Sequence, residues 1–180
     1  MIKLKKILII ALMLVCLPIT CFATDLKIIM TDPTPEVDKT TFSDNDISIM
    51  FYLNGRNGIS FNLKNLTNKL IKIDWNQVSI IDLDQTAHRA LHTGIVFAQR
   101  NDPQAPTVIP PIPMTKLNDT LFMLDHISFD NVFLVGDQWV IHDFLTAKDV
   151  NKTIGVFLPL EIGGTVKYYS FSFRIVKDLN

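Results

Sequence analysis

The sequence predicts an all-β protein, an Ig-like antiparallel β-sandwich of about seven to nine strands that follows an N-terminal signal peptide. Three observations lead to this prediction. Short runs with an apolar residue at every second position recur along the chain, as expected for strands with one buried face. Turn-forming residues separate these runs at the spacing of about eight to twelve residues that is typical of sandwiches. No long stretch has the 3.6-residue period of an amphipathic helix.

Residues 1–23 have the composition of a secretory signal peptide. A basic start precedes the apolar run Ile7–Val15, and small residues at Cys21 and Ala23 fit a cut after Ala23. The apolar run is shorter than the roughly 20 residues that a membrane-spanning helix needs, so cleavage is expected and an uncleaved membrane anchor is the alternative. We therefore expect one β-sandwich domain, residues 24–180, in the periplasm or secreted.

Both cysteines of the chain, Cys16 and Cys21, lie in this segment, so the expected mature domain has no disulfide and no cysteine chemistry. The alternative is lipidation of Cys21, which would anchor the protein to the outer membrane. Thr20, directly before it, fits poorly at the small position of a lipoprotein cut site. The net charge of the whole chain is −1, and removal of the three lysines of this segment makes it −4. We expect no nucleic acid partner for such an acidic product.

Two hairpins are expected in the first half of the domain. The glycines and asparagines of Asn54–Gly58 form a turn between the alternating runs Ile47–Leu53 and Ile59–Leu63. The polar stretch Asn65–Lys69 is then expected to pair the second run with Leu70–Trp75. Each run has one apolar face, which a second sheet must cover, and a tryptophan at the end of a strand is expected in the core between the sheets.

The remaining chain has clear and unclear parts. The polar stretch 31–46 is expected to be a loop, and the proline-rich Asn101–Pro113 an edge strand or an extended crossover. Gly163-Gly164 indicates a tight final hairpin. The stretch 124–150 has neither the two-residue period of a strand nor the 3.6-residue period of a helix, and within it a small hairpin is expected to turn at Gly136-Asp137. Further strands are expected at 24–30, 78–83, 86–91, 115–124, 153–162 and 166–176.

Few residues indicate chemistry. His88 and His92 are four apart, and on a strand they share a face but lie about 13 Å apart, too far to bind one metal ion together. Surface or hydrogen-bonded histidines are the favoured interpretation. The alternative is a small hydrolase, or a metal- or sugar-binding domain, that uses both histidines and nearby acids. The acid pair Asp82 and Asp84 is instead expected in a turn, where aspartate bonds the backbone. No nucleophile or phosphate-loop motif is present, so we expect no enzyme, no cofactor and no metal site.

A group of large aromatic residues lies in the stretch without a clear period. If these residues are exposed together they form a partner-binding patch, because monomers seldom expose large apolar areas. If they are buried they belong to the core. The residues of this candidate partner-binding patch are Phe129, Phe133, Trp139 and Phe144.

Three segments between Phe61 and Pro111 also carry a resemblance. They are Phe61–Trp75, His88-Arg89 with His92-Thr93-Gly94, and Asn101–Pro111. In these segments the chain resembles a group of small exported bacterial envelope proteins, some of them lipid-anchored, that have no assigned activity. The resemblance implies an envelope location and an Ig-like fold. The poor lipidation site at Cys21 departs from the lipid-anchored members.

Export, a sandwich pattern and the lack of catalytic motifs together predict a function class. We expect an exported binding or structural module of the cell envelope without catalytic activity. Such a module would dock on a larger periplasmic or surface assembly of proteins. An edge strand or the aromatic segment Phe129–Phe144 would make the contact, by strand addition at the edge of a sheet.

Overall fold

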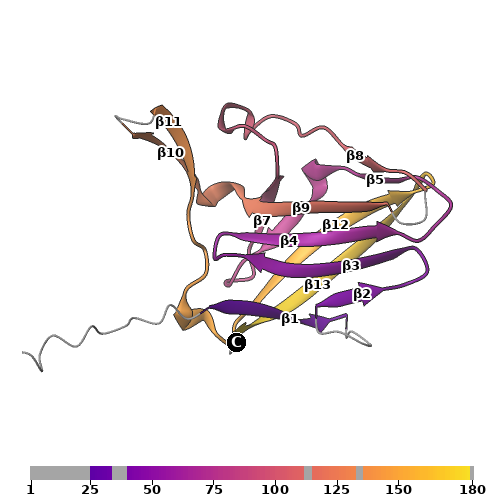
Figure 1. Ribbon diagram of the computed structural model, residues 1–180, viewed down its shortest axis with the longest axis horizontal. Helices are drawn as coiled ribbons and strands as arrows, with labels where there is room; N and C mark the ends of the chain where they lie inside the picture. Colours follow the sequence, from indigo (N-terminus) through magenta and orange to yellow (C-terminus); the bar gives the residue numbers. More distant parts are fainter. Residues whose placement is uncertain (1–24, 34–39, 112–114, 133–135, 179–180) are drawn as a thin grey trace, which may run out of the picture.

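The computed structural model describes residues 25–33, 40–111, 115–132 and 136–178 (Figure 1). The expected signal peptide, 1–23, lies outside the described residues. The described chain is all-β, with thirteen strands and four short 3₁₀ helices. The strands are β1 (Leu26–Asp32), β2 (Thr41–Ser43), β3 (Ile47–Asn54), β4 (Gly58–Asn65), β5 (Ile71–Ile73), β6 (Ser79–Ile81), β7 (Ala87–His92), β8 (Thr107–Ile109), β9 (Lys116–Met123), β10 (Ile127–Val132), β11 (Gly136–Ile141), β12 (Thr153–Ile162) and β13 (Thr165–Lys177), and the helices are η1 (Trp75–Gln77), η2 (Phe97–Gln99), η3 (Leu124–His126) and η4 (Ala147–Asp149).

Eleven strands form two packed layers that are joined through β7. The strand order is β1-β13-β12-β6-β7-β9-β4-β3-β2, with β5 beside β6 on β12 and β8 on the outer edge of β5. The paired strands are antiparallel throughout, so the predicted antiparallel β-sandwich is confirmed. The thirteen described strands exceed the predicted seven to nine, and β2, with only three residues, lies in a stretch that was expected to be a loop. The Ig-like part stays a prediction.

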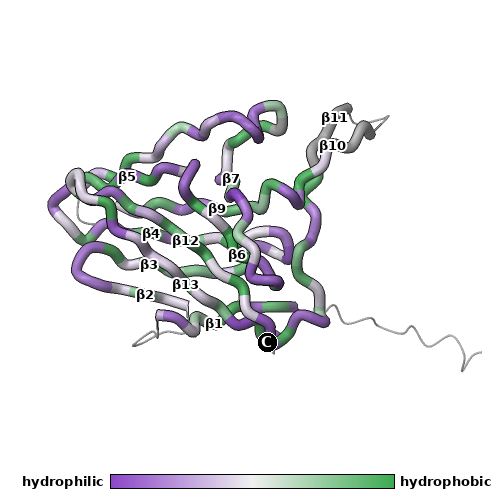
Figure 2. Tube along the Cα trace, turned by 180° about the vertical axis from the view of Figure 1, so that it is seen from behind, coloured by the Kyte–Doolittle hydropathy of each residue, from purple (hydrophilic) through white to green (hydrophobic). Residues whose placement is uncertain are grey.

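The core lies between the layers and is rich in aromatic rings. Phe51 of β3 contacts Phe171 and Phe173 of β13, with ring centroids 4.8 and 4.9 Å apart. Trp75 is buried, as expected, and its indole N–H donates to Thr107 Oγ1 at 2.9 Å. Figure 2 shows apolar and polar residues alternating along the strands of both layers. The alternation predicted from the sequence therefore corresponds to inward and outward faces.

The predicted second hairpin is wrong. β4 pairs with β3 and β9 in one layer, whereas β5 pairs with β12 and β8 in the other, so the turn between β4 and β5 is a crossover between layers. Asn65 holds this crossover. Its side chain is buried, its amide donates to Lys69 O at 2.8 Å and Pro110 O at 3.2 Å, and its oxygen accepts from Thr67 N–H at 2.9 Å. Two alternating runs beside a polar turn cannot distinguish a hairpin from a crossover, because both produce the same local pattern.

Other expectations are mostly confirmed. The turns at 54–58 and Gly163-Gly164 are present, and the proline-rich segment contributes the edge strand β8. β2 lies within the expected loop 31–46 and was not predicted. The small hairpin exists, but β11 begins at Gly136, so the expected turn at Gly136-Asp137 is wrong. Within the described residues, no helix reaches the length and hydropathy that crossing a membrane requires.

Candidate functional site

A ribbon of two strands projects from the sandwich and forms a sheet of its own (Figure 1). We call it the arm, β10 with β11. Its ladder runs from Ile127 opposite Ile141 to Val132 opposite Gly136. No other strand among the described residues pairs with either outer edge of the arm. Isolated two-stranded ribbons are only marginally stable in water, and the outer backbone N–H and C=O groups of such a ribbon are open to pairing with a further strand.

The chain returning from the arm is fixed to the turn between β3 and β4. The backbone N–H groups of Phe144 and Leu145 both donate to Arg56 O, at 3.0 and 3.2 Å. The Asn57 amide donates to Ile141 O at 3.4 Å. The Phe144 side chain is 8% exposed and its ring meets the edge of the His126 ring, with centroids 6.1 Å apart. Phe144 therefore anchors the base of the arm in the core.

The two strands are also joined to each other at the base. His142 N–H donates to His126 O at 2.8 Å, which extends the ladder by one bond below Ile127 and Ile141. A hydrogen bond between Ser128 Oγ and His142 Nε2 closes the same end of the ribbon. The base of the arm is thus a defined structure and not a free linker.

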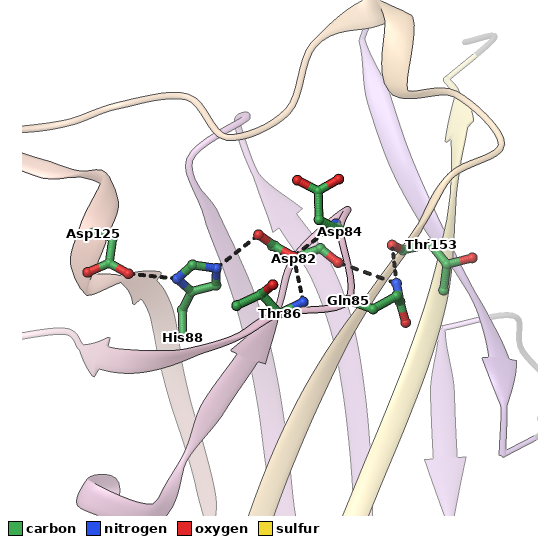
Figure 3. A network of polar contacts seen from close by, with 7 residues as sticks. All are labelled: Asp82, Asp84, Gln85, Thr86, His88, Asp125 and Thr153. Atoms are coloured by element: carbon green, nitrogen blue, oxygen red, sulfur yellow. Dashed lines mark hydrogen bonds and ion pairs between the residues drawn. The ribbon is translucent and has the colours of Figure 1, made fainter.

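The chain leading into the arm is held by a bridge of three side chains (Figure 3). His88 of β7 bonds Asp125 of η3 through Nδ1, at 2.7 Å from Oδ2, and Asp82 through Nε2, at 2.9 Å from Oδ2. Asp82 lies in the turn between β6 and β7, where its other oxygen accepts the backbone N–H groups of Asp84 and Thr86. Aspartate is favoured at such turns because it can bond the backbone ahead of it.

The electrostatics of this bridge favour a charged histidine. The hydrogen bond to Asp125 raises the pKa of His88, burial opposes the rise, and the bond to Asp82 adds to it. Burial would raise the pKa of Asp82, but the hydrogen bonds from Thr86, His88 and Asp84 outweigh it and the pKa lies below its ordinary value. When charged, His88 donates from both ring nitrogens and keeps no lone pair for a metal or a substrate proton.

His92 has a different environment at the other end of β7. Its ring stacks on Trp75, with centroids 4.3 Å apart and planes 11° apart, and Nδ1 lies 3.2 Å from Asp119 Oδ2. Burial disfavours the charged form of Asp119, but hydrogen bonds from His92, Thr93 and Thr120 outweigh it and lower the pKa of the carboxyl. The backbone N–H of His92 donates to the buried Gln104, so this group fastens the chain before β8 to β7.

The predicted residues are thus distributed over separate groups. His88 and His92 each contact a carboxylate, but they belong to two different clusters, and no group of three or more potential ligands that could hold a metal ion occurs among the described residues. Asp84 lies on the surface beside the bridge. Sequence reasoning did not single out Asp125 or Asp119, because both meet their histidines only through the pairing of β7 with β9 and the start of η3.

The candidate partner-binding patch has a mixed outcome. Phe129 and Trp139 are register partners in the arm, and Phe144 belongs to the core at its base. Phe133, like Cys21, lies outside the described residues. The four residues therefore do not stand as one described surface.

Comparison with models of known protein families, with curated proteins and with solved structures finds no match.

Proposed function

We propose that this protein is an exported binding or structural module of the cell envelope, without catalytic activity, that docks on a larger periplasmic or surface assembly through the arm. The observation that carries the proposal is the arm itself, a ribbon with both outer edges unpaired among the described strands. The occupant we propose is an extended segment of a partner protein, which would add a third strand to the ribbon. Main-chain hydrogen bonds supply the affinity in this binding mode.

The way the arm is attached supports this role. The Asp82–His88–Asp125 bridge holds the chain that enters it, and the backbone of Arg56 holds the chain that leaves it. A binding element held in place at its base loses less conformational entropy on docking than a free loop would. The signal-like segment 1–23 and the resemblance to exported envelope proteins support the periplasm or the outside of the cell as its location.

A second candidate is a small periplasmic hydrolase or a metal- or sugar-binding domain built on His88 and His92. The contact of each histidine with a carboxylate favours it, because histidine–carboxylate pairs are common in catalytic sites. Against it, both ring nitrogens of His88 are already bonded, and the His92 ring is stacked on the buried Trp75. We therefore prefer the binding module.

The test is site-specific photo-crosslinking in intact cells. A photo-reactive phenylalanine analogue replaces Ser128 or Gln138 in the arm and, as matched controls, Tyr52 or Ser170 on the outer faces of the two layers. We expect both arm positions to crosslink to the same envelope protein, and the peptides found by mass spectrometry to map to one extended segment. Crosslinks that are equally strong from the control positions, or absent from the arm, would refute the proposal.

The intact mass of the protein from soluble and membrane fractions tests the location. A soluble chain that begins at Thr24 supports free export. A chain that begins at Cys21 and carries acyl groups supports the lipid-anchored alternative instead.

A further inference from the structure

A pair of lysines faces the solvent on the outer side of the layer formed by β2, β3, β4 and β9. Lys64 of β4 and Lys116 of β9 are direct register partners, and Ser48 of β3 lies on the other side of Lys64. The next pair on the same face is Asn62 with Asn118. These five residues line a hollow of about 490 Å³.

This arrangement is unfavourable for the isolated sheet. Like charges that lie directly opposite each other on neighbouring strands destabilise the pair. No ion pair or side-chain hydrogen bond within the described residues involves Lys64 or Lys116, in contrast to the paired lysines Lys27, Lys72 and Lys167. Two positive charges therefore share one hollow without a compensating carboxylate among the residues that the structure describes.

The described acids near the hollow bond other groups. Asp119 follows Asn118 on β9, but its side chain turns inward and bonds His92. Asp46, at the start of β3, is paired with Lys167, and Asp44 accepts the Tyr169 hydroxyl. The amides of Asn62 and Asn118 also have no side-chain hydrogen bond within the described residues, so the residues that line the hollow include four side chains with an available nitrogen donor.

We infer that this hollow binds the phosphate group of a phosphate ester. Two ammonium groups and two amides offer the donors that the oxygens of a doubly charged phosphate accept, and hydrogen bonds between charged partners are the strong ones. Met50 lines the hollow and Tyr52 follows it on the same face of β3. Their surfaces are 37% and 43% exposed, and they offer apolar contact to the organic part of the ester. The net negative charge of the chain does not oppose this local site, because screening limits the influence of distant charges to about 10 Å.

The site is separate from the arm and uses none of its residues. A soluble phosphate ester and the headgroup of a phosphorylated lipid would present the same chemistry to the two lysines. The experiment therefore compares both sources, and its outcome does not depend on whether the arm binds a protein.

The experiment is calorimetric titration of the mature chain with glycerol 3-phosphate, and with vesicles of phosphatidylcholine alone or mixed with phosphatidic acid. We expect Lys64→Gln/Lys116→Gln to weaken binding by more than about tenfold, which corresponds to the loss of charged hydrogen bonds. The matched control is Lys177→Gln at the exposed end of β13, where the register partner is Leu26 and not a second lysine. Its affinity is expected to equal that of the wild type.

Thermal unfolding gives a second readout that does not depend on the variant losing an activity. Glycerol 3-phosphate should raise the Tm of the wild type and not that of the double variant, because a ligand stabilises only the state that binds it. Without ligand, the double variant should melt no lower than the wild type, since the substitution removes a repulsion.

Binding of the soluble ester alone assigns a soluble ligand, and binding of the vesicles with phosphatidic acid assigns a lipid headgroup. The inference is overturned if the wild type binds neither, if the double variant binds as well as the wild type, or if Lys177→Gln loses as much affinity.

Discussion

Asn65 makes a sharp test of how the two layers are joined. Its side chain is 1% exposed and bonds Lys69 O, Pro110 O and both the N–H and the hydroxyl of Thr67. Replacement by alanine leaves these groups without their partner. A hydrogen bond contributes about 1 kcal/mol net and an orphaned buried group costs about 1–3 kcal/mol, while water can reach the half-buried Thr67. We expect Asn65→Ala to lower the free energy of unfolding by about 2–4 kcal/mol.

Asn65→Asp separates hydrogen bonding from side-chain size. The new carboxyl would face the carbonyl oxygens of Lys69 and Pro110, which repel a carboxylate but accept a bond from a protonated acid. The pKa of the introduced carboxyl in the folded state should thus exceed the value of about 3.9 that an aspartate has in the unfolded chain. A group with a raised pKa loses stability as pH rises, so the deficit against the wild type should be small near pH 4 and reach about 3–5 kcal/mol at pH 7.

Urea unfolding of the protein at both pH values measures these differences. Asn62→Ala, on the outer face of the same strand and without a side-chain hydrogen bond within the described chain, is the matched control and should change stability by less than about 0.5 kcal/mol. If Asn65→Ala costs no more than this control, or if the deficit of Asn65→Asp does not grow with pH, the assignment of Asn65 as the polar support of the crossover is wrong.

Three other parts of the fold can be tested in the same way. Because the pKa of His88 is raised in the folded protein, the stability that charged His88 contributes should be fully present below about pH 6.5 and be lost as pH rises through the folded-state pKa. The difference in unfolding free energy between the wild type and His88→Gln should therefore become smaller as pH rises. Phe144→Ala should destabilise the protein by about 3–5 kcal/mol in urea unfolding, because the ring is buried. Gly163→Ala should cost about 1–2 kcal/mol, since Gly163 has φ +56° and an added Cβ would lie 2.5 Å from Lys69 Cδ.

Each of these predictions has an outcome that contradicts it. For His88, an NMR titration of the ring with a midpoint at or below about pH 6.5 would show that the two aspartates do not stabilise the charged form of the histidine. For Phe144, a loss of partner crosslinking with unchanged stability would return the residue to the partner-binding patch. For Gly163, the asparagine variant serves as control, because asparagine tolerates positive φ better than alanine; equal costs for both would exclude backbone strain.

Much of the fold was predictable because the local sequence of its longer strands shows a clear alternating pattern. Ile47–Leu53, Ile59–Leu63 and the final hairpin around Gly163-Gly164 each combine a period of two with a definite turn, and all three were confirmed. The partners of the strands were not predictable in the same way. Whether Ile71–Ile73 pairs with β4 or with β12 depends on contacts about ninety residues away, which no local pattern encodes.

For the candidate site too, local features were predictable from the sequence and long-range contacts were not. The sequence indicated that His88 and His92 lie on a strand and share a face, and it identified an aromatic stretch without a clear period. It carried no sign that Asp125 and Asp119 would meet these histidines, because those contacts depend on the pairing of β7 with β9. It also carried no sign that Lys64 and Lys116 would be opposite each other, because the register between β4 and β9 joins residues about fifty positions apart. Phe144 was placed in the candidate partner-binding patch and is buried, because hydrophobicity alone does not distinguish a core residue from an exposed binding residue.

The pairing of β1 with β13 has a consequence for how the chain folds. Leu26, near the start of the described chain, lies opposite Lys177, near its end, and the register holds from there to Met30 opposite Phe173. Among the described strands, β1 can pair with β13 only after β13 has been synthesised, so β1 lacks this partner until nearly all of the described chain has been made. Such long-range closure slows folding and increases the time in which strands can pair wrongly. A circular permutant that joins the two ends would bring β1 and β13 close together in sequence. Comparing its refolding rate with that of the natural chain would measure how far this long-range pairing limits the folding rate.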